Sequence, residues 1–417
     1  MSAKLTVDLD DLRAVLASCP MPPKSAAESQ HTPAVHLLAD QDHQQLVVTT
    51  QTSDSRLRGR VPAQVEAGGQ QALPPAILRS WVDSVDRSRK ARVSMTEALR
   101  TDEEGKKTRN RAPGQAVVIQ LPDKAGQAAQ LSSGTSRVQM PTLVDHVEFD
   151  FGRPTSEPWQ VDAEQTNRAL RACASVSNQP FVPERAKGVH LVLSPGQLVV
   201  EGTDGRQVMR HVVTAQNDAE QVDGRLPGWW APMWDLGVKL DQHLNQPADR
   251  LGMWIDPERG HVWVRTNTWA SVAVGMSGDY PNLSAATWDH EKATRSWVIH
   301  TKALQAAVEE VAAGDTRRVS LRLFGGELHI SGSDSSGRVA TTSIPQMVPG
   351  PDLQGRLELL ADSLTGQLNF FQDQTVYLGQ MDGTQSVQLW SESANQFGWL
   401  AARPIPEEAT NDRLADA

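Results

Sequence analysis

The chain has few cysteines, few tyrosines and no long apolar stretch. Two cysteines and two tyrosines occur among 417 residues. This cysteine count excludes a disulfide-dense secreted scaffold. No run of 18 apolar residues is present, so the sequence predicts no membrane-spanning helix. The first residues, MSAKLTVDLDD, lack the apolar run of a secretory signal, and we therefore expect a cytoplasmic protein.

Signals for catalysis and for metal binding are also missing. The eleven histidines are scattered, and the sequence has neither a zinc-type Cys/His spacing nor His-Glu-x-x-His. The segment 275–279 breaks the nucleophile-elbow pattern at its last glycine, and the segment 202–205 lacks the lysine of a phosphate loop. Asp8, Asp10 and Asp11 are explained by capping and by favourable charge in a first helical turn. We expect no enzyme, no metal and no cofactor.

A gapless pattern of fifteen residues occurs three times in the chain. The copies are LTVDLDDLRAVLASC (5–19), WQVDAEQTNRALRAC (159–173) and WVIHTKALQAAVEEV (297–311). Each begins with a short extended run and continues with apolar residues at helical spacing. Asp8, Asp162 and His300 mark the turn into the predicted helix, where Asp is a suitable N-cap. Copies more than a hundred residues apart indicate three repeats of one domain.

A second set of elements follows each copy. Two β-branched runs flank turn residues at 40–42, 194–196 and 324–326, which is typical of hairpins. A second helix is predicted in each repeat, at 74–85, 231–244 and 359–371, and further strands follow. Strands joined by tight turns are antiparallel, so we predict an α+β fold.

The length agrees with three domains of ordinary size. We predict three repeated domains at 1–150, 157–288 and 295–406, with a charged insertion at about 99–115 and a polar tail at 407–417. The insertion mixes both signs of charge, which favours a solvated loop over a finger that contacts DNA. Cys19 and Cys173 occupy the same position of the repeat, which favours a small buried hydrophobic residue there.

These repeats, in this order, resemble the bacterial DNA polymerase III beta subunit, the ring-shaped sliding clamp. The resemblance covers most of residues 4–405 and is strongest at GVHLVLSPGQLVVEGTDGRQVMRHVV (188–213). GDYPN (278–282), SVQL (386–389) and RPI (403–405) resemble later segments of that family. The resemblance implies a homodimer of six domains, with helices lining the hole and sheets outside. It also places Val138 and Met140 near the dimer contact.

A ring that encircles DNA is held there by topology, so it needs few phosphate contacts. With few and weak contacts, such a ring can slide along the DNA. The net charge of −10 counts against a conventional DNA-binding protein, but it is compatible with basic residues confined to an inner face. Solvated helix charges are the alternative interpretation. The candidate DNA-facing residues on predicted helices are Arg13, Arg79, Arg87, Lys90, Arg168, Arg171, Lys239 and Lys302.

The resemblance further implies a groove that holds short peptide motifs of the polymerase and of the clamp loader. Such a groove needs apolar walls and a few polar groups that fix the peptide backbone. Val208, Pro281, Pro404 and Ile405 would supply the walls. The full set of residues carried over is Ala186, Thr203, Gly205, Arg206, Gln207, Val208, Pro281, Ser386, Arg403, Pro404 and Ile405.

Tryptophan is abundant, with twelve residues. Trp229, Trp230 and Trp234 cluster at the start of a predicted helix, and Trp254, Trp263 and Trp269 follow on strands. A stacking platform for single-stranded nucleic acid is one interpretation of these residues, and core packing is the other, which we favour because several of them fall on apolar faces of the repeat.

From the resemblance we expect a sliding clamp, a homodimer that encircles duplex DNA without sequence preference and tethers the polymerase in the cytoplasm, at the nucleoid during replication. The alternative is a clamp-like scaffold that does not encircle DNA and acts as a regulatory binding protein.

Overall fold

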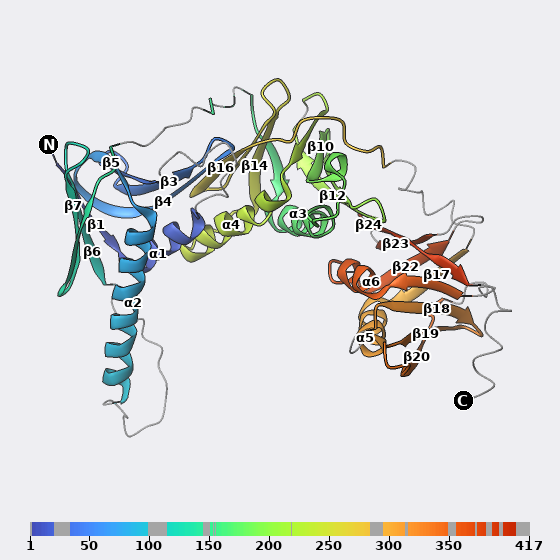
Figure 1. Cartoon of the computed structure of the whole chain (residues 1–417). Helices are drawn as coiled ribbons and strands as arrows, with labels where there is room; N and C mark the ends of the chain where they lie inside the picture. Colours follow the sequence, from blue (N-terminus) through green and yellow to red (C-terminus); the bar gives the residue numbers. More distant parts are fainter. Residues whose placement is uncertain are drawn as a thin grey trace. The chain divides into compact units, whose positions relative to one another are not determined.

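The computed structural model describes residues 2–20, 34–98, 115–144, 151–283, 295–312, 316–348, 356–380, 386–391 and 395–405, apart from residues 153, 155, 218 and 372. The chain divides into two compact units, which are described separately (Figure 1). The first unit consists of Met1–Ala163 and Met233–Val274, and the second of Glu164–Pro232 and Gly275–Ala417. The division falls inside residues 157–288, so the three-domain boundaries stay a prediction.

The first unit contains three α-helices and twelve strands within its described residues. The helices are α1 (Leu9–Ser18), α2 (Pro75–Ala98) and α4 (Met233–His243). The strands are β1 (Ala3–Asp8), β2 (Val35–Asp40), β3 (Gln45–Gln51), β4 (Ser55–Ala67), β5 (Gly69–Leu73), β6 (Ala116–Leu121), β7 (Ala128–Ser133), β8 (Ser136–Pro141), β9 (Trp159–Asp162), β14 (Arg250–Asp256), β15 (His261–Arg265) and β16 (Trp269–Val274).

Every strand pair of the first unit is antiparallel. One sheet has the order β9-β14-β15-β16-β4-β3-β2-β5, and the long strand β4 also pairs with β1, from which the order continues β1-β6-β7-β8. Helices α1 and α4 pack on one face of the first sheet (Figure 1). Gly59 of β4 allows this approach, because a Cβ atom there would lie 2.8 Å from Val15 and 3.2 Å from the sulfur of Cys19.

The second unit repeats this plan. Its helices are α3 (Ala163–Ser177), α5 (Thr301–Val311) and α6 (Ala361–Leu368), with short 3₁₀ turns at Glu184–Ala186 and Gly228–Trp230. Its strands are β10 (Val189–Ser194), β11 (Gln197–Thr203), β12 (Gln207–Gln216), β13 (Val222–Leu226), β17 (Arg295–His300), β18 (Arg318–Phe324), β19 (Glu327–Ser333), β20 (Val339–Pro345), β21 (Arg356–Leu360), β22 (Thr375–Gln380), β23 (Ser386–Ser391), β24 (Gln396–Ala401) and β25 (Arg403–Ile405).

Two antiparallel sheets organise these strands. One has the order β13-β10-β11-β12-β24-β23-β22-β17 and the other β20-β19-β18-β21-β25. Trp297, Leu304 and Val308 are at most 1 % exposed and belong to one apolar core with Leu321 and Leu364. Burial of apolar side chains of this size contributes about 1.5–3 kcal/mol each.

The predicted α+β fold, the repeated strand–helix unit and all three hairpins are confirmed. The Asp8 side chain caps α1 by accepting a hydrogen bond from the Asp10 amide at 2.8 Å, whereas His300 precedes α5 without a capping side-chain bond. The predicted end of the second helix at residue 85 is wrong, because α2 continues to Ala98. The second helix of the third repeat is shorter than predicted.

Most tryptophans pack in the core, as predicted, since Trp230, Trp234 and Trp269 are at most 2 % exposed. Trp254 and Trp263 are only partly buried and lie on the outward side of β14 and β15, so core packing is wrong for these two. Both cysteines are buried, in agreement with their predicted role. The insertion at 99–114 and the tail at 406–417 lie outside the described residues.

Candidate functional site

The candidate DNA-facing residues lie on five helices, with Arg87 and Lys90 on the part of α2 beyond its predicted end, and their side chains differ in exposure. Arg87, Arg171 and Lys302 are exposed, whereas Arg13 and Arg168 are partly buried. The side chain of Lys90 lies outside the described residues. These helices therefore carry cations that solvent can reach.

Three of these cations form ion pairs with carboxylates. Arg13 lies 3.3 Å from Asp86, Arg168 lies 2.8 Å from Glu164, and Lys239 pairs with Asp235. The Glu164 carboxylate is 86 % exposed, so water screens its pair. Exposed pairs of this kind contribute about 0–1 kcal/mol, which a phosphate group can replace without a large cost.

Arg79 has a different role within the first unit. Its Nη2 atom donates hydrogen bonds to the carbonyl oxygens of Leu16 at 3.3 Å and Cys19 at 2.8 Å. Carbonyls at a helix C-terminus have no partner within the helix. Burial lowers the pKa of the Arg79 guanidinium from its ordinary value. Arg79 therefore holds the end of α1, and little of its donor capacity faces solvent.

Five of the predicted groove residues form the turn between β11 and β12. The Thr203 hydroxyl donates to the Gln207 carbonyl at 2.7 Å and accepts from the Gly205 amide at 3.1 Å. The Asp204 carboxylate accepts from the Arg206 and Gln207 amides, both at 2.8 Å. Gly205 has a φ of +85°, which a residue with a side chain rarely adopts. The sequence Thr-Asp-Gly thus fixes the turn by its own hydrogen bonds.

The turn is continuous with the last strands of the chain. Gln207 and Val208 of β12 face Leu400 and Trp399 of β24, and the Ala401 amide donates to the Arg206 carbonyl at 2.9 Å. Ser386 faces Ala401 from β23. Beyond Ala402, Arg403–Ile405 form β25, whose backbone pairs with β21. The structure therefore brings the predicted C-terminal groove segment to the end of the strand that carries Val208.

Arg225 joins the remaining groove segments. Its guanidinium donates to the Arg185 carbonyl at 2.8 Å and to the Ser277 carbonyl. Ala186 follows the first of these residues and is 3 % exposed. Arg225 itself is 7 % exposed, so its charge lies among backbone dipoles. No pattern in the sequence indicates this brace, because an arginine in a strand usually faces water.

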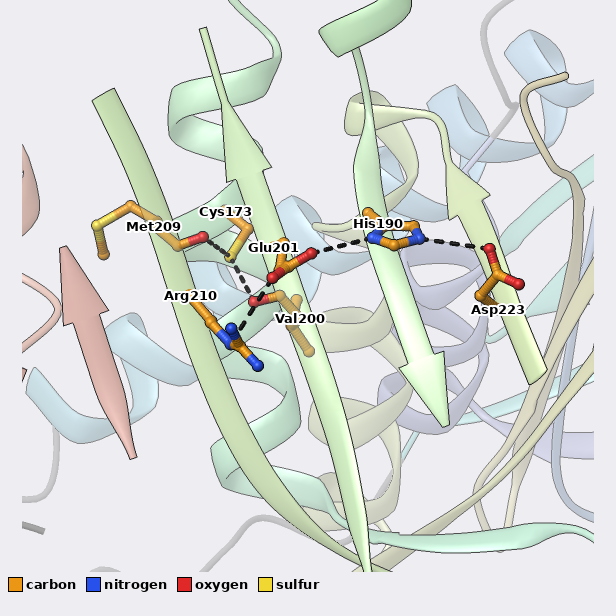
Figure 2. Close-up of polar contacts among 7 residues, drawn as sticks. All are labelled: Cys173, His190, Val200, Glu201, Met209, Arg210 and Asp223. Atoms are coloured by element: carbon orange, nitrogen blue, oxygen red, sulfur yellow. Dashed lines mark hydrogen bonds and ion pairs between the residues drawn. The ribbon is translucent and has the colours of Figure 1, made fainter. Parts of the chain in front are cut away.

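Charged residues form a network on the sheet that contains β10, β11, β12 and β13 (Figure 2). His190 lies between two carboxylates, with Nδ1 3.1 Å from Glu201 and Nε2 3.4 Å from Asp223. Arg210 approaches Glu201 at 3.7 Å. On the other side of β11, the Cys173 thiol points at the carbonyls of Val200 and Met209.

His190 stacks on Tyr280, with ring centroids 4.7 Å apart and planes inclined by 20°. Burial raises the pKa of the Tyr280 phenol well above its usual value, so the ring is neutral. Because Pro281 follows Tyr280 in the chain, the stacking of Tyr280 on His190 also positions Pro281. The segment Gly-Asp-Tyr-Pro-Asn offers an aromatic ring for stacking, but nothing in it identifies His190 as the partner.

An exposed aromatic residue adjoins the turn. Phe181 is 61 % exposed, and the guanidinium of Arg206 lies 5.9 Å from its ring centroid. No motif in the sequence indicates Phe181. With Arg206 exposed beside it, this pair presents an apolar plane and a cation to solvent.

A small polar cavity of about 110 Å³ lies elsewhere in the second unit. Its lining residues are Gln165, Arg168, His211, Val212, Val213, Asp373, Asn395 and Gln396. His211 is 3 % exposed, and burial followed by the charge of Arg168 lowers its pKa from 6.5 to about 4. The imidazole is therefore neutral at pH 7.

Val138 and Met140, predicted near a dimer contact, lie on β8. Met140 is 1 % exposed and packs inward, whereas Val138 is partly exposed. Within the described part of the chain, β8 pairs with β7 alone and β20 pairs with β19 alone. Both are therefore edge strands with one row of unpaired backbone groups.

Over the described residues, the structure has no cluster of three His, Cys, Asp or Glu side chains suited to a metal ion. Nor does any helix within those residues have the length and apolar character needed to cross a membrane.

Comparison with known proteins gives structural matches only. No family model matches the sequence, and no curated protein matches it. The DNA polymerase III beta subunit of Pseudomonas aeruginosa superposes with a TM-score of 0.75 at 15% identity, over 96% of this chain and 100% of that one. The polymerase sliding clamp of Bacillus subtilis gives 0.75 at 12% identity, over 97% and 100%. The beta subunit of Streptococcus pyogenes gives 0.74 at 11% identity, over 96% and 100%. The chain has the fold of the DNA polymerase III beta sliding clamps.

Proposed function

We propose that the protein is a sliding clamp, a homodimeric ring that encircles duplex DNA and tethers a replicative polymerase. The clamp fold over nearly the whole chain carries this proposal, because the full length of each solved clamp is covered. Three domains per chain, at 1–150, 157–288 and 295–406, would make half of a six-domain ring. The family's cytoplasmic location at the DNA is part of the same proposal.

Two of the edge strands, β8 and β20, support ring closure. We place the dimer contact between β8 of one protomer and β20 of its partner, because each strand leaves one edge unpaired. β20 also exposes Val339, whose side chain is 63 % exposed. Antiparallel pairing across the protomers would satisfy the free amides and carbonyls and cover this valine.

The helical cations would face the enclosed DNA. Exposed Arg87, Arg171 and Lys302, together with the screened pairs of Arg168 and Lys239, offer weak contacts to phosphates. Weak contacts without base readout suit a ring that must slide. We therefore expect salt-sensitive binding without sequence preference.

The groove residues would bind the polymerase and the clamp loader through short peptide motifs. Within the second unit, the Arg206 carbonyl of the Thr203 turn accepts from the Ala401 amide of β24, and Arg225 holds the carbonyls of Arg185 and Ser277, which precede Ala186 and Pro281 in the chain. A leucine or phenylalanine anchor buried there contributes about 1.5–3 kcal/mol, which suits partners that exchange.

Solution mass tests the ring most simply. Light scattering at micromolar concentration is expected to give twice the chain mass of 45.5 kDa. A mass of one chain under these conditions would indicate the alternative, a clamp-like scaffold that does not encircle DNA. Adding a clamp-binding peptide separates the two further, because a scaffold binds the peptide as a monomer.

A further inference from the structure

The outward face of the sheet β14-β15-β16-β4 in the first unit carries a row of cationic and aromatic side chains. Trp254 faces Trp263, Trp263 faces Val272, and Val272 faces Arg56. In the neighbouring row Arg265 faces Ala270, which faces Arg58. Residues paired across adjacent strands point to the same side of a sheet, so all these side chains share one face.

The opposite side of this sheet packs against helices. Leu57, Val262 and Val264 alternate with the outward residues and are at most 1 % exposed. Helices α1 and α4 cover that side (Figure 1). The Trp269 ring lies against Gly237 of α4. The outward side also holds a small packed cluster, since Val272 and Phe151 are at most 3 % exposed, but Arg58, Arg60 and Arg265 on that side are exposed and are not explained by packing.

The arginines of β4 are evenly spaced along the strand. Arg56, Arg58 and Arg60 occupy alternate positions of β4, so their Cα atoms are about 6.8 Å apart. Arg265 lies two strands from Arg58, at about 9.6 Å, with only the small Ala270 between them. Arg58, Arg60 and Arg265 are exposed. A patch of this sign stands out in a chain of net charge −10.

The guanidinium groups and the rings contact one another. The Arg56 guanidinium lies 5.8 Å from the Trp263 ring centroid and 5.4 Å from that of Phe151. Arg265 lies 5.8 Å from the Trp254 ring. The indole N–H of Trp254 donates to the Ser156 carbonyl at 2.8 Å, which fixes the ring plane. These contacts hold flat π surfaces on the sheet in defined orientations.

The exposed arginines of this face have N–H groups that can contact a ligand. Arg60 donates from Nε and Nη2 to the Asn267 carbonyl, which leaves its other donors directed elsewhere. Within the described ranges, Arg58 and Arg265 have no carboxylate at ion-pair distance. Asp256 shares this face, but its carboxylate accepts from the Glu258 and Arg259 amides at 3.1 Å.

We propose that this face, formed by Arg56, Arg58, Arg60, Arg265, Trp254 and Trp263, binds single-stranded nucleic acid. Arginines reach phosphates, while bases stack on indole rings and guanidinium planes. A duplex is a poorer ligand, because its bases are already stacked and paired. An acidic peptide would use the cations but not the π surfaces. The binding is distinct from the proposed passage of duplex DNA along the helices.

Fluorescence anisotropy with a labelled oligothymidine of 20 nucleotides tests the proposal on the full chain. The double variant Arg58→Glu/Arg265→Glu is expected to bind at least tenfold more weakly than the wild type. For single strands the slope of log K against log salt should fall in magnitude by about 1.4, for two lost contacts. The matched control Lys124→Glu/Arg317→Glu makes the same charge change at exposed sites outside the face and should bind like the wild type.

Trp263→Leu keeps an apolar cover over Val272 and removes a stacking plane, so it should weaken binding by at least about fivefold. Equal affinity of the Arg58/Arg265 variant and its charge control would overturn the proposal. So would competition by polyglutamate as effective as that of unlabelled oligothymidine, which would assign the face to an acidic protein.

Discussion

The Nη2 atom of Arg79 on α2 donates a hydrogen bond of 2.8 Å to the carbonyl oxygen of Cys19, the C-cap residue of α1. This bond joins two helices and closes the end of one of them. A charged donor to a buried acceptor is stronger than a neutral one.

Arg79→Ala should therefore lower the free energy of unfolding by about 1–2 kcal/mol, since it leaves the carbonyls of Leu16 and Cys19 unsatisfied. Arg87→Ala, on the exposed side of the same helix, should change it by less than about 0.5 kcal/mol. Urea unfolding of both variants measures the difference. Equal stabilities would mean that the helix end is satisfied by water.

His211 predicts a pH dependence of stability. Its pKa is lowered to about 4 in the folded protein, against 6.5 for the free side chain, because burial and Arg168 disfavour the imidazolium. The unfolded chain thus binds more protons between these values, and stability is lost as the pH falls from 6.5 to 4. The loss from this residue is about 3 kcal/mol.

His211→Gln removes this titration, so its unfolding free energy should depend less on pH over that interval than that of the wild type. Urea unfolding at pH 7 and pH 4 provides the comparison. Parallel pH profiles for the two proteins would show that His211 gains no charge on unfolding.

The two cysteines should be inert in the folded protein. Burial raises the pKa of the Cys19 thiol to about 12 and that of Cys173 well above its usual value. At pH 8 the thiolate fraction of Cys19 is then about one part in ten thousand. An aromatic disulfide reagent should react with neither thiol in buffer and with both in urea. Rapid labelling in buffer would contradict the buried positions.

Val339→Glu should split the dimer, because it places a charge on the exposed edge strand β20. Val144→Glu is a matched control, since the two valines are 63% and 64% exposed. Sedimentation should give the mass of one chain for the first variant and of two chains for the second. A dimeric Val339→Glu protein would place the contact away from β20.

Ile405→Asp should abolish binding of a clamp-binding peptide while the dimer persists, since a charge would face the proposed apolar wall. The unmodified protein should bind such a peptide at about micromolar affinity. Removing residues 406–417 should leave affinity unchanged or raise it. Peptide titration against the three proteins decides, and unaltered binding by Ile405→Asp would place the partner site elsewhere.

Much of the fold could be predicted, because residues close together in the sequence determine the elements of the repeat. Helix-period apolar residues follow each short strand, and turn residues separate the hairpin strands, so neither feature depends on distant contacts. The end of α2 could not be predicted this way, because its last turns are charged and lack an apolar stripe.

The candidate site was less accessible to prediction. The Thr203 turn follows from its own residues, but the brace by Arg225 depends on carbonyls 40 and 52 positions away. Core packing is the prediction for Trp254 and Trp263, because several of the tryptophans fall on apolar faces of the repeat. Alternation with buried Met253, Val262 and Val264 places them on the outward face instead. Val200 and Glu201 lie on opposite faces of β11 and are both buried. Alternation of polar and apolar residues along the strand therefore does not indicate the network around His190.

Release from DNA of defined topology tests the central claim, that the chain forms a ring around duplex DNA. The labelled protein is loaded by its clamp loader onto nicked circular DNA, and the complex is then cut once with a restriction enzyme. We expect long retention on the circle and rapid loss after linearisation at the same salt concentration. Equal release from circular and linear DNA would contradict the account.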